Sequence, residues 1–232
     1  MAGATAAEFI EAMHALRSDA ERAKIRRYLR SEKDFEVIGV RMKQLFDTAK
    51  SFERMPLDQV DLLLDSPYYE ARVGAVSILD FKARRKGIGD DERRELYLLY
   101  LRRHDRINNW DLVDRAAPRV IGWYLLDKPR RPLYELAASA DVWERRTAIT
   151  ASFWFIRAGE VDDALALAGI LLDDPEEPVH KSVGTALREI GKVDRDRLLA
   201  FLREHAERMP RVTLRYAVER LPPELRAELM RR

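Results

Sequence analysis

The chain has 232 residues and no cysteine, with 42 Lys and Arg against 40 Asp and Glu and a formal net charge of +2. This length supports a substantial hydrophobic core, and the lack of cysteine excludes thiol catalysis and a disulfide framework. No apolar run approaches the roughly 20 residues that span a bilayer, and the N-terminus lacks the basic start and apolar stretch of a secretory signal. We therefore expect a cytoplasmic protein with no membrane partner. The near-zero charge balance does not by itself indicate nucleic acid binding.

Apolar residues recur three and four positions apart along nearly the whole chain, which is the period of an amphipathic helix. Helices are predicted at 7–17, 21–29, 40–52, 56–64, 68–83, 92–101, 109–126, 132–139, 142–158, 161–172, 177–191, 194–206, 211–220 and 223–231. Proline and glycine fall between these segments, and no segment alternates as a strand does. The predicted fold is therefore all-α.

Three segments share one pattern, in which a turn is followed by a polar or basic pair and then by small residues. Residues 65–76 read DSPYYEARVGAV, residues 139–149 read SADVWERRTAI, and residues 173–184 read DDPEEPVHKSVG. A repeat of mid-thirties length with two helices is typical of an α-solenoid of HEAT-like antiparallel helix pairs. We expect one such domain over residues 1–232, with small residues that allow close helix packing.

Residues 108–114, NNWDLVD, form the entry to the helix predicted at 109–126. Asn108 or Asn109 can cap this helix. Asp111 has Arg115 four residues later, so we expect a surface ion pair between them. Asp114 lies beside the apolar stripe with no local cationic partner, which indicates a distant partner or a chemical task. Proline at position 118 removes the hydrogen bond to the carbonyl of Asp114, so a kink or a helix restart is expected there.

The repeat register aligns five polar or basic residues near the starts of successive inner helices. These residues are Arg72, Asn109, Arg145, Lys181 and Arg215. Cations and helix N-termini in one line would make a concave basic groove that attracts phosphates. The alternative is solvated surface charge with acidic neighbours. Arg146 is placed one repeat after Trp110 and is expected near Asp114, either as an ion pair that fixes the stacking or as a phosphate ligand.

The segments WDLVD (110–114) and WERRTAI (143–149) together resemble the AlkD-like family of DNA alkylation repair proteins, which are HEAT-like-repeat DNA glycosylases. Tyr28 with FEVIGVR (35–41), and KSVGTALRE (181–189), extend the resemblance to roughly residues 10–220. The resemblance implies that Asp114 is the catalytic aspartate, Trp110 a groove tryptophan and Arg146 a groove arginine. It also places Arg41, Thr185 and Arg188 near DNA. Thr185 departs from the family, which commonly has a second groove tryptophan at this position.

The resemblance implies base excision repair of double-stranded DNA that contains alkylated purines. In the expected reaction Asp114 stabilises an oxocarbenium-like sugar and orients water, while Trp110 packs on deoxyribose. No lysine stands out as a Schiff-base nucleophile, so hydrolysis without strand cleavage is expected, and an open groove suggests no deep pocket. Scattered histidines without metal-ligand spacing predict no metal and no cofactor. We expect a monomer; the alternative function is a non-catalytic HEAT-repeat module that binds DNA or serves as a protein scaffold.

Overall fold

The computed structural model describes residues 4–29 and 35–231. Within these ranges the regular structure is helical, apart from one isolated parallel bridge between Glu36 and Tyr68. This confirms the all-α prediction. No helix among the described residues is long and apolar enough to cross a membrane.

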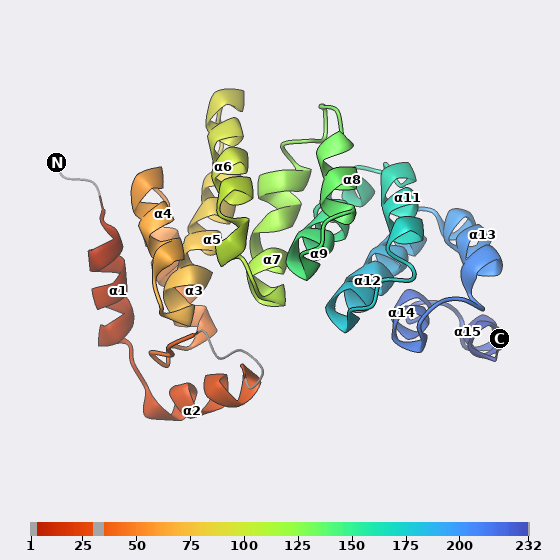
Figure 1. Ribbon diagram of the computed structural model, residues 1–232, viewed down its shortest axis with the longest axis horizontal. Helices are drawn as coiled ribbons and strands as arrows, with labels where there is room; N and C mark the ends of the chain where they lie inside the picture. Colours follow the sequence, from red (N-terminus) through yellow and green to blue (C-terminus); the bar gives the residue numbers. More distant parts are fainter. Residues whose placement is uncertain (1–3, 30–34, 232) are drawn as a thin grey trace. The chain divides into compact units, whose positions relative to one another are not determined.

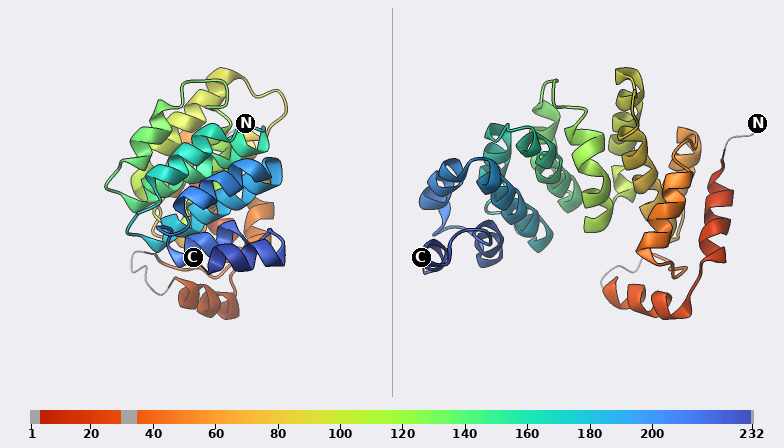
Figure 2. Two further views of the ribbon diagram at one scale, coloured as in Figure 1. Left: turned by 90° about the vertical axis from the view of Figure 1, so that its right-hand side faces the viewer. Right: turned by 180° about the vertical axis from the view of Figure 1, so that it is seen from behind.

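The chain divides into two compact units, residues 1–116 and 117–232, near the end of helix α7 (Trp110–Ala117). The prediction of a single domain over 1–232 stays a prediction. Unit 1 contains α1 (Ala6–Ala15), α2 (Asp19–Tyr28), α3 (Met42–Ser51), α4 (Leu57–Asp65), α5 (Tyr69–Ala83), α6 (Asp90–Arg102), a 3-10 turn (His104–Arg106) and most of α7 (Figure 1). Unit 2 contains a π-helical turn (Pro118–Gly122), α8 (Arg131–Ala137), α9 (Val142–Ala151), α10 (Phe153–Arg157), α11 (Asp162–Ile170), α12 (Glu177–Val193), α13 (Arg195–His205), α14 (Arg211–Ala217) and α15 (Pro223–Met230) (Figure 2).

Helix α5 is the central element of unit 1. Every residue of α5 except Phe81 is buried, and the helix packs against α1, α3, α4 and α6. Gly74 makes the approach of α1 possible, because a Cβ atom at this position would lie 2.3 Å from Cζ of Phe9. The prediction that small residues in the repeats allow close packing is therefore confirmed in this unit.

Helix α12 has the same role in unit 2, where it packs against α9, α10, α11, α13 and α14. A Cβ atom at Gly184 would lie 2.6 Å from the carbonyl oxygen of Thr213, so glycine is required for the close contact with α14. The hydroxyl groups of Thr150 and Ser182 are 2.8 Å apart and join α9 to α12. Helix α12 is thus fixed to α14 by close backbone approach and to α9 by a short polar contact.

The helix predicted over 109–126 is interrupted at the proline. Helix α7 ends at Ala117, and a π-helical turn follows in which the Trp123 amide donates to the carbonyl of Pro118 at 3.0 Å. Proline has no amide to bond the carbonyl four residues before it, so the α-helical pattern stops at this point. The expected restart is confirmed.

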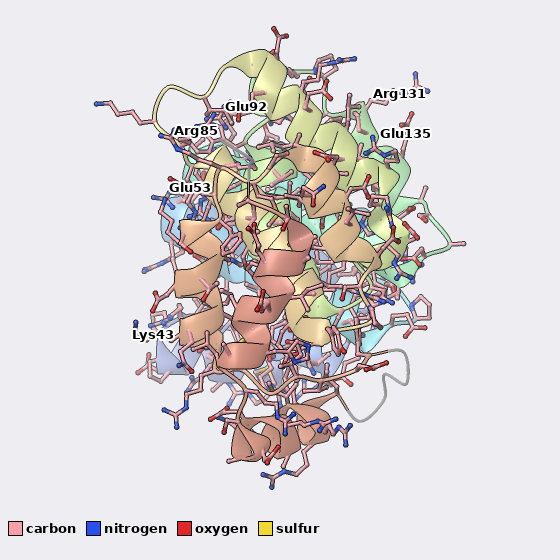
Figure 3. All side chains as sticks on the ribbon, turned by 90° about the vertical axis from the view of Figure 1, so that its left-hand side faces the viewer. Lys43, Glu53, Arg85, Glu92, Arg131 and Glu135 are labelled. Carbon is pink, nitrogen blue, oxygen red and sulfur yellow. The ribbon has the colours of Figure 1, made fainter. Side chains whose placement is uncertain are left out.

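Surface charges of both units are largely arranged in local ion pairs. Lys43 and Asp47 are 2.6 Å apart on α3, Arg131 and Glu135 are 2.7 Å apart on α8, and Arg85 pairs with Glu92 (Figure 3). Exposed pairs of this kind contribute little to stability. They do, however, neutralise many cations that the sequence alone leaves available for a ligand.

The buried carboxylate of Glu70 fixes the segment that joins α2 to the rest of unit 1. Glu70 is fully buried and accepts hydrogen bonds from the amides of Ile38 (3.0 Å), Gly39 (2.7 Å) and Val40 (3.3 Å). Gly39 has φ +99° and accepts a 2.8 Å bond at its carbonyl from the amide of Ser18, the N-cap of α2. A Cβ atom at Gly39 would lie 2.5 Å from the Ser18 carbonyl, so glycine is required here.

Replacing the Glu70 carboxylate should therefore destabilise the protein. We expect Glu70→Ala to lower the free energy of unfolding by about 3 kcal/mol, because three buried amides lose a charged acceptor. Urea denaturation measures the change. Glu11→Ala, at an exposed position of α1, is the control and should stay within about 0.5 kcal/mol of the parent; equal effects of the two changes would contradict the anchoring role.

Candidate functional site

Helix α7 carries Trp110 and Asp114 on its accessible face. Leu112 and Val113 are fully buried, whereas Trp110 is 41% exposed and Asp114 is exposed. The helix begins as expected at Asn109, whose side-chain oxygen accepts from the Trp110 amide at 2.7 Å and whose carbonyl accepts from Val113 at 3.2 Å. Because Trp110 and Asp114 are four residues apart, they lie on the same face of the helix. An exposed tryptophan beside an accessible carboxylate is typical of a binding surface.

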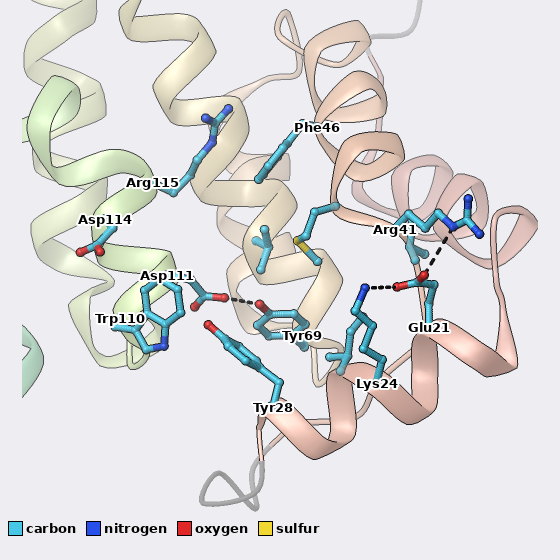
Figure 4. Close-up of a pocket in the computed structure, with 14 residues that line it drawn as sticks. Glu21, Lys24, Tyr28, Arg41, Phe46, Tyr69, Trp110, Asp111, Asp114 and Arg115 are labelled. Carbon is cyan, nitrogen blue, oxygen red and sulfur yellow. Dashed lines mark hydrogen bonds and ion pairs between the residues drawn. The ribbon is translucent and has the colours of Figure 1, made fainter. Parts of the chain in front are cut away.

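Trp110 and Asp114 border a cavity of about 750 Å³ in unit 1 (Figure 4). The cavity has an apolar floor, four aromatic side chains and charged groups of both signs. Its lining residues are Glu21, Lys24, Ile25, Tyr28, Val40, Arg41, Met42, Phe46, Tyr69, Val73, Trp110, Asp111, Asp114 and Arg115. Helix α2 borders one side of this space, and α5 and α7 border the other. The expectation that an open groove has no deep pocket stays a prediction.

Tyr28 is a site residue to which the sequence analysis gave no role. Its ring meets the ring of Trp110 edge to face, with centroids 5.7 Å apart, and its side chain is directed toward the same end of the cavity as Asp111. Tyr28 is 49% exposed. Two exposed aromatic rings in contact give a surface that packs on a sugar and attracts positive charge. An exposed tyrosine at the end of a highly charged helix was the signal available in the sequence.

Asp111 is a second carboxylate that lines the cavity. It does not form the ion pair with Arg115 that its sequence spacing predicts. Asp111 accepts hydrogen bonds from the hydroxyl of Tyr69 and from the Leu112 amide at 2.9 Å. Burial raises the pKa of the Asp111 carboxyl to about 6, although the hydrogen bond from Tyr69 acts in the opposite direction. Burial and the neighbouring Asp111 carboxylate raise the pKa of the Tyr69 phenol.

Arg115 instead turns toward α5. Its Nη2 atom lies 3.2 Å from the fully buried carboxylate of Asp80, and its Nε atom donates to the hydroxyl of Ser77 at 3.0 Å. The guanidinium also lies over the ring of Phe46, 4.5 Å from its centroid. The i,i+4 spacing predicted a local pair, but the tertiary structure supplies a more deeply buried acid for the same arginine.

The predicted row of basic residues is only partly exposed in unit 1. Arg72 is 3% exposed, donates to the Ser66 carbonyl at 2.9 Å and lies over the ring of Phe35, 4.6 Å from its centroid. Asn109 is 1% exposed and caps α7. This corrects the prediction that the two residues belong to an accessible row that attracts phosphates. Both side chains are nearly inaccessible and hold turns instead. Arg41 is exposed at the cavity, with its Nε atom 3.4 Å from Glu21.

In unit 2 the adjacent arginines of α9 are also engaged with the protein. Arg145 donates to the Ser139 carbonyl at 3.0 Å and pairs at 2.6 Å with Asp174, while Arg146 is 6% exposed and donates to the Pro178 carbonyl. The contacts with Asp174 and Pro178 join α9 to the segment around the start of α12. The proximity of Arg146 to Asp114 and the DNA contacts of Arg145 and Arg146 stay predictions.

Three predicted DNA ligands on α12 and α14 are more accessible than the α9 pair. Lys181 is paired with Glu177 at 2.6 Å, with 44% of its side chain exposed. Arg215 is exposed and lies 5.8 Å from the ring centroid of Tyr216. Arg188 is held by Glu219 and Glu189. Their roles in DNA binding stay predictions.

Thr185 has no aromatic ring, and its hydroxyl group already forms a hydrogen bond within the protein. It is partly buried, and its hydroxyl donates to the Lys181 carbonyl at 2.8 Å, one turn earlier in the same helix. The observed geometry of this position is that of a helix residue with a satisfied hydroxyl.

The exposed face of α2 carries cations that the sequence analysis did not single out. Arg26 and Arg27 are exposed near its C-terminus. Within the described ranges, neither guanidinium group forms a hydrogen bond or an ion pair with another residue. Lys24, one turn earlier, lies at the cavity and is 3.6 Å from Glu21. The helix that closes the cavity therefore carries accessible positive charge.

No group of three or more His, Asp or Glu side chains that would hold a metal ion occurs within residues 4–29 and 35–231. The chemical groups that the cavity offers are three carboxylates, aromatic rings and cations.

Comparison with known proteins gives a family for the chain and a solved structure of similar fold. The model of a family described as DNA alkylation repair enzyme matches residues 9–221. A solved structure described as a predicted DNA alkylation repair enzyme from Enterococcus faecalis has a similar fold, with a TM-score of 0.68 and 14% sequence identity, and the similarity covers 89% of this chain and 97% of that one. No curated protein matches the sequence.

The structural role of Arg145 leads to a stability prediction. The side chains of Arg145 and Asp174 are 12% and 2% exposed, so Arg145→Gln leaves a buried carboxylate without its partner. We expect the free energy of unfolding to fall by about 3–5 kcal/mol. The exposed pair of Lys181 and Glu177 gives the contrast, because Lys181→Gln should cost less than about 1 kcal/mol. Guanidinium denaturation of both variants checks the difference, and a negligible loss in Arg145→Gln would remove the structural assignment.

Proposed function

Because the chain belongs to the DNA alkylation repair enzyme family, we propose that it is a DNA glycosylase that hydrolyses the N-glycosidic bond of cationic N3- and N7-alkylated purines. The observation that carries this proposal is the shared accessible face of α7. There Asp114 and Trp110 lie at the edge of a cavity whose other walls include Tyr28 and Tyr69. This set of groups is suited to a substrate that carries positive charge.

The proposed chemistry follows from the charge of the substrate. An alkylated N3 or N7 atom gives the purine a positive charge, so the base departs as a neutral molecule with the bonding electrons. The sugar is left with oxocarbenium character at C1′. The Asp114 carboxylate opposes this developing charge and orients the water that attacks C1′. Trp110 and Tyr28 present ring faces to the sugar and to the cation.

The proposal assigns DNA binding to cations of both units. In unit 1, Lys24, Arg26, Arg27 and Arg41 surround the cavity or continue its edge along α2. In unit 2, Arg146, together with Lys181, Arg188 and Arg215, is proposed to contact phosphates on the ground of the family resemblance. Arg72 and Asn109 act by holding turns. Arg145 also holds a turn, and its contact with DNA stays a prediction. Phosphate contacts of this kind position the duplex without reading its sequence.

A non-catalytic DNA-binding module is the competing function. Thr185 supports it, since a threonine with its hydroxyl bonded to the Lys181 carbonyl replaces an aromatic wall. The accessible Asp114 and the pair of rings at Trp110 and Tyr28 support the enzyme. The two functions differ in one measurable property, which is the release of a free base.

Removal of the Asp114 charge should abolish excision while leaving the fold intact. We expect Asp114→Asn to reduce the single-turnover release of 7-methylguanine from methylated duplex DNA by about 10²–10³-fold, because the carboxylate acts on charge that develops in the transition state. Chromatography of the released base measures this loss. Asp105→Asn, at an exposed position outside the cavity, should excise at the parental rate. Release by neither the parent nor any variant, with salt-sensitive DNA binding retained, would establish the non-catalytic module instead.

The basic face of α2 should contribute to DNA affinity through counterion release. We expect Arg26→Gln and Arg27→Gln each to reduce the slope of log affinity against log salt by about 1. Fluorescence anisotropy with a labelled duplex at several salt concentrations gives this slope. Arg131→Gln changes an exposed arginine already paired with Glu135 and should leave the slope unchanged. An unaltered slope in the double variant of α2 would show that this helix does not contact DNA.

A further inference from the structure

Asp111 and Asp114 present two carboxylates to one cavity. They are three residues apart on α7, so they share a face of the helix, and both line the 750 Å³ space. Asp114 is exposed, whereas Asp111 is set deeper against α5. The hydroxyl of Tyr69 and the Leu112 amide each donate to Asp111. Its carboxylate therefore has a fixed orientation before any ligand arrives.

No cation neutralises Asp111 directly within the described part of the chain. Arg115 is directed to Asp80 and Ser77, and Lys24 and Arg41 are paired with Glu21. The other titratable and charged groups that line the cavity are Glu21, Lys24 and Tyr28 on α2, Arg41 before α3, Tyr69 on α5, and Asp114 and Arg115 on α7. The fully buried Glu70 of α5 does not line the cavity, but its charge acts on Tyr69. Two of these groups act directly on the Asp111 carboxylate. Tyr69 donates a hydrogen bond to it, and the negative charge of Asp114 repels its charge.

We propose that Asp111, held in place by Tyr69, is a specificity-determining residue that makes the cavity select positively charged ligands over neutral ones of the same shape. This inference rests on the proposed glycosylase function and adds a second negative charge to the Asp114 site. A half-buried carboxylate such as Asp111 acts more strongly than an exposed one on a nearby cation, because less water screens it. The pair thus discriminates between a cationic sugar or base and a neutral one by charge rather than by size.

The selectivity depends on pH through Asp111. Burial gives the Asp111 carboxyl a pKa of about 6, so the second charge is present at pH 7.5 and is lost as the pH falls to 5. The raised pKa also means that the folded protein binds this proton more tightly than the unfolded chain. Ionisation of Asp111 consequently lowers stability as the pH rises from about 4 to 6. Asp111→Asn removes this destabilising charge, so it should lower selectivity at pH 7.5 without lowering the melting temperature.

The test compares binding of two duplexes by fluorescence anisotropy between pH 5 and 8. One duplex carries a cationic pyrrolidine analogue of the abasic sugar, and the other carries the neutral tetrahydrofuran analogue. For the parent protein we expect the affinity ratio of cationic to neutral duplex to rise about tenfold from pH 5 to 7.5. In Asp111→Asn the ratio at pH 7.5 should fall about tenfold and should no longer change with pH.

Two further variants separate selectivity from a merely structural role. Tyr69→Phe removes a hydrogen bond that favours the ionised carboxylate, so it should keep the pH-dependent preference and move its midpoint upward. Asp47→Asn changes an exposed aspartate of α3 outside the cavity and should behave as the parent. A pH-independent parental ratio, or a lower melting temperature in Asp111→Asn at pH 7.5, would overturn the inference.

The outcome also distinguishes this inference from the proposed function. If the cationic duplex is preferred and this preference depends on Asp114 but not on Asp111, the glycosylase proposal stands and the inference fails. If the parent shows no preference for the cationic duplex and releases no alkylated base, the proposed function itself fails.

Discussion

The site of unit 1 depends on the three hydrogen bonds that the buried Glu70 carboxylate accepts from the amides of residues 38–40. These bonds hold an extended segment against α5, and the same segment receives the N-cap of α2 through the Ser18–Gly39 bond. Helix α2 is highly charged and buries only Ile25, so hydrophobic packing alone holds it weakly. Without the Glu70 anchor, the wall that Glu21, Lys24 and Tyr28 provide would have little to fix it over α5 and α7.

The arginines show how a repeat protein divides one residue type between two tasks. Arg72 and Arg145 occupy similar places in their helices, and each donates to the carbonyl six residues earlier. Each thus closes the turn that precedes its own helix. Exposed cations such as Arg26 and Arg27 lack such bonds within the described residues, so they retain their charge for a ligand. Burial decides which task an arginine has, because a buried guanidinium requires fixed acceptors.

The two aspartates of α7 also differ in burial and in the groups that they contact. Asp114 faces solvent beside an exposed tryptophan, while Asp111 points inward and is satisfied by a tyrosine hydroxyl and an amide. The Asp111 carboxylate, kept in a partly apolar cavity without a cation paired to it among the described residues, costs stability. Such an arrangement is typical of sites where charge serves a ligand rather than the fold.

The sequence by itself determined the helical class, the break at Pro118 and the exposed face of Trp110 and Asp114. These features depend on local periodicity, on the missing amide of proline and on spacing along one helix, all of which are visible in neighbouring residues. The tertiary structure alone decided the partners of Asp111 and Arg115, the burial of Arg72 and the cavity behind α2. Those outcomes depend on contacts between residues about 40 positions apart, such as Tyr69 with Asp111 and Asp80 with Arg115. A spacing rule within one helix predicts the local partner, but the deeper acid on a neighbouring helix binds the arginine because burial strengthens the attraction between the charges.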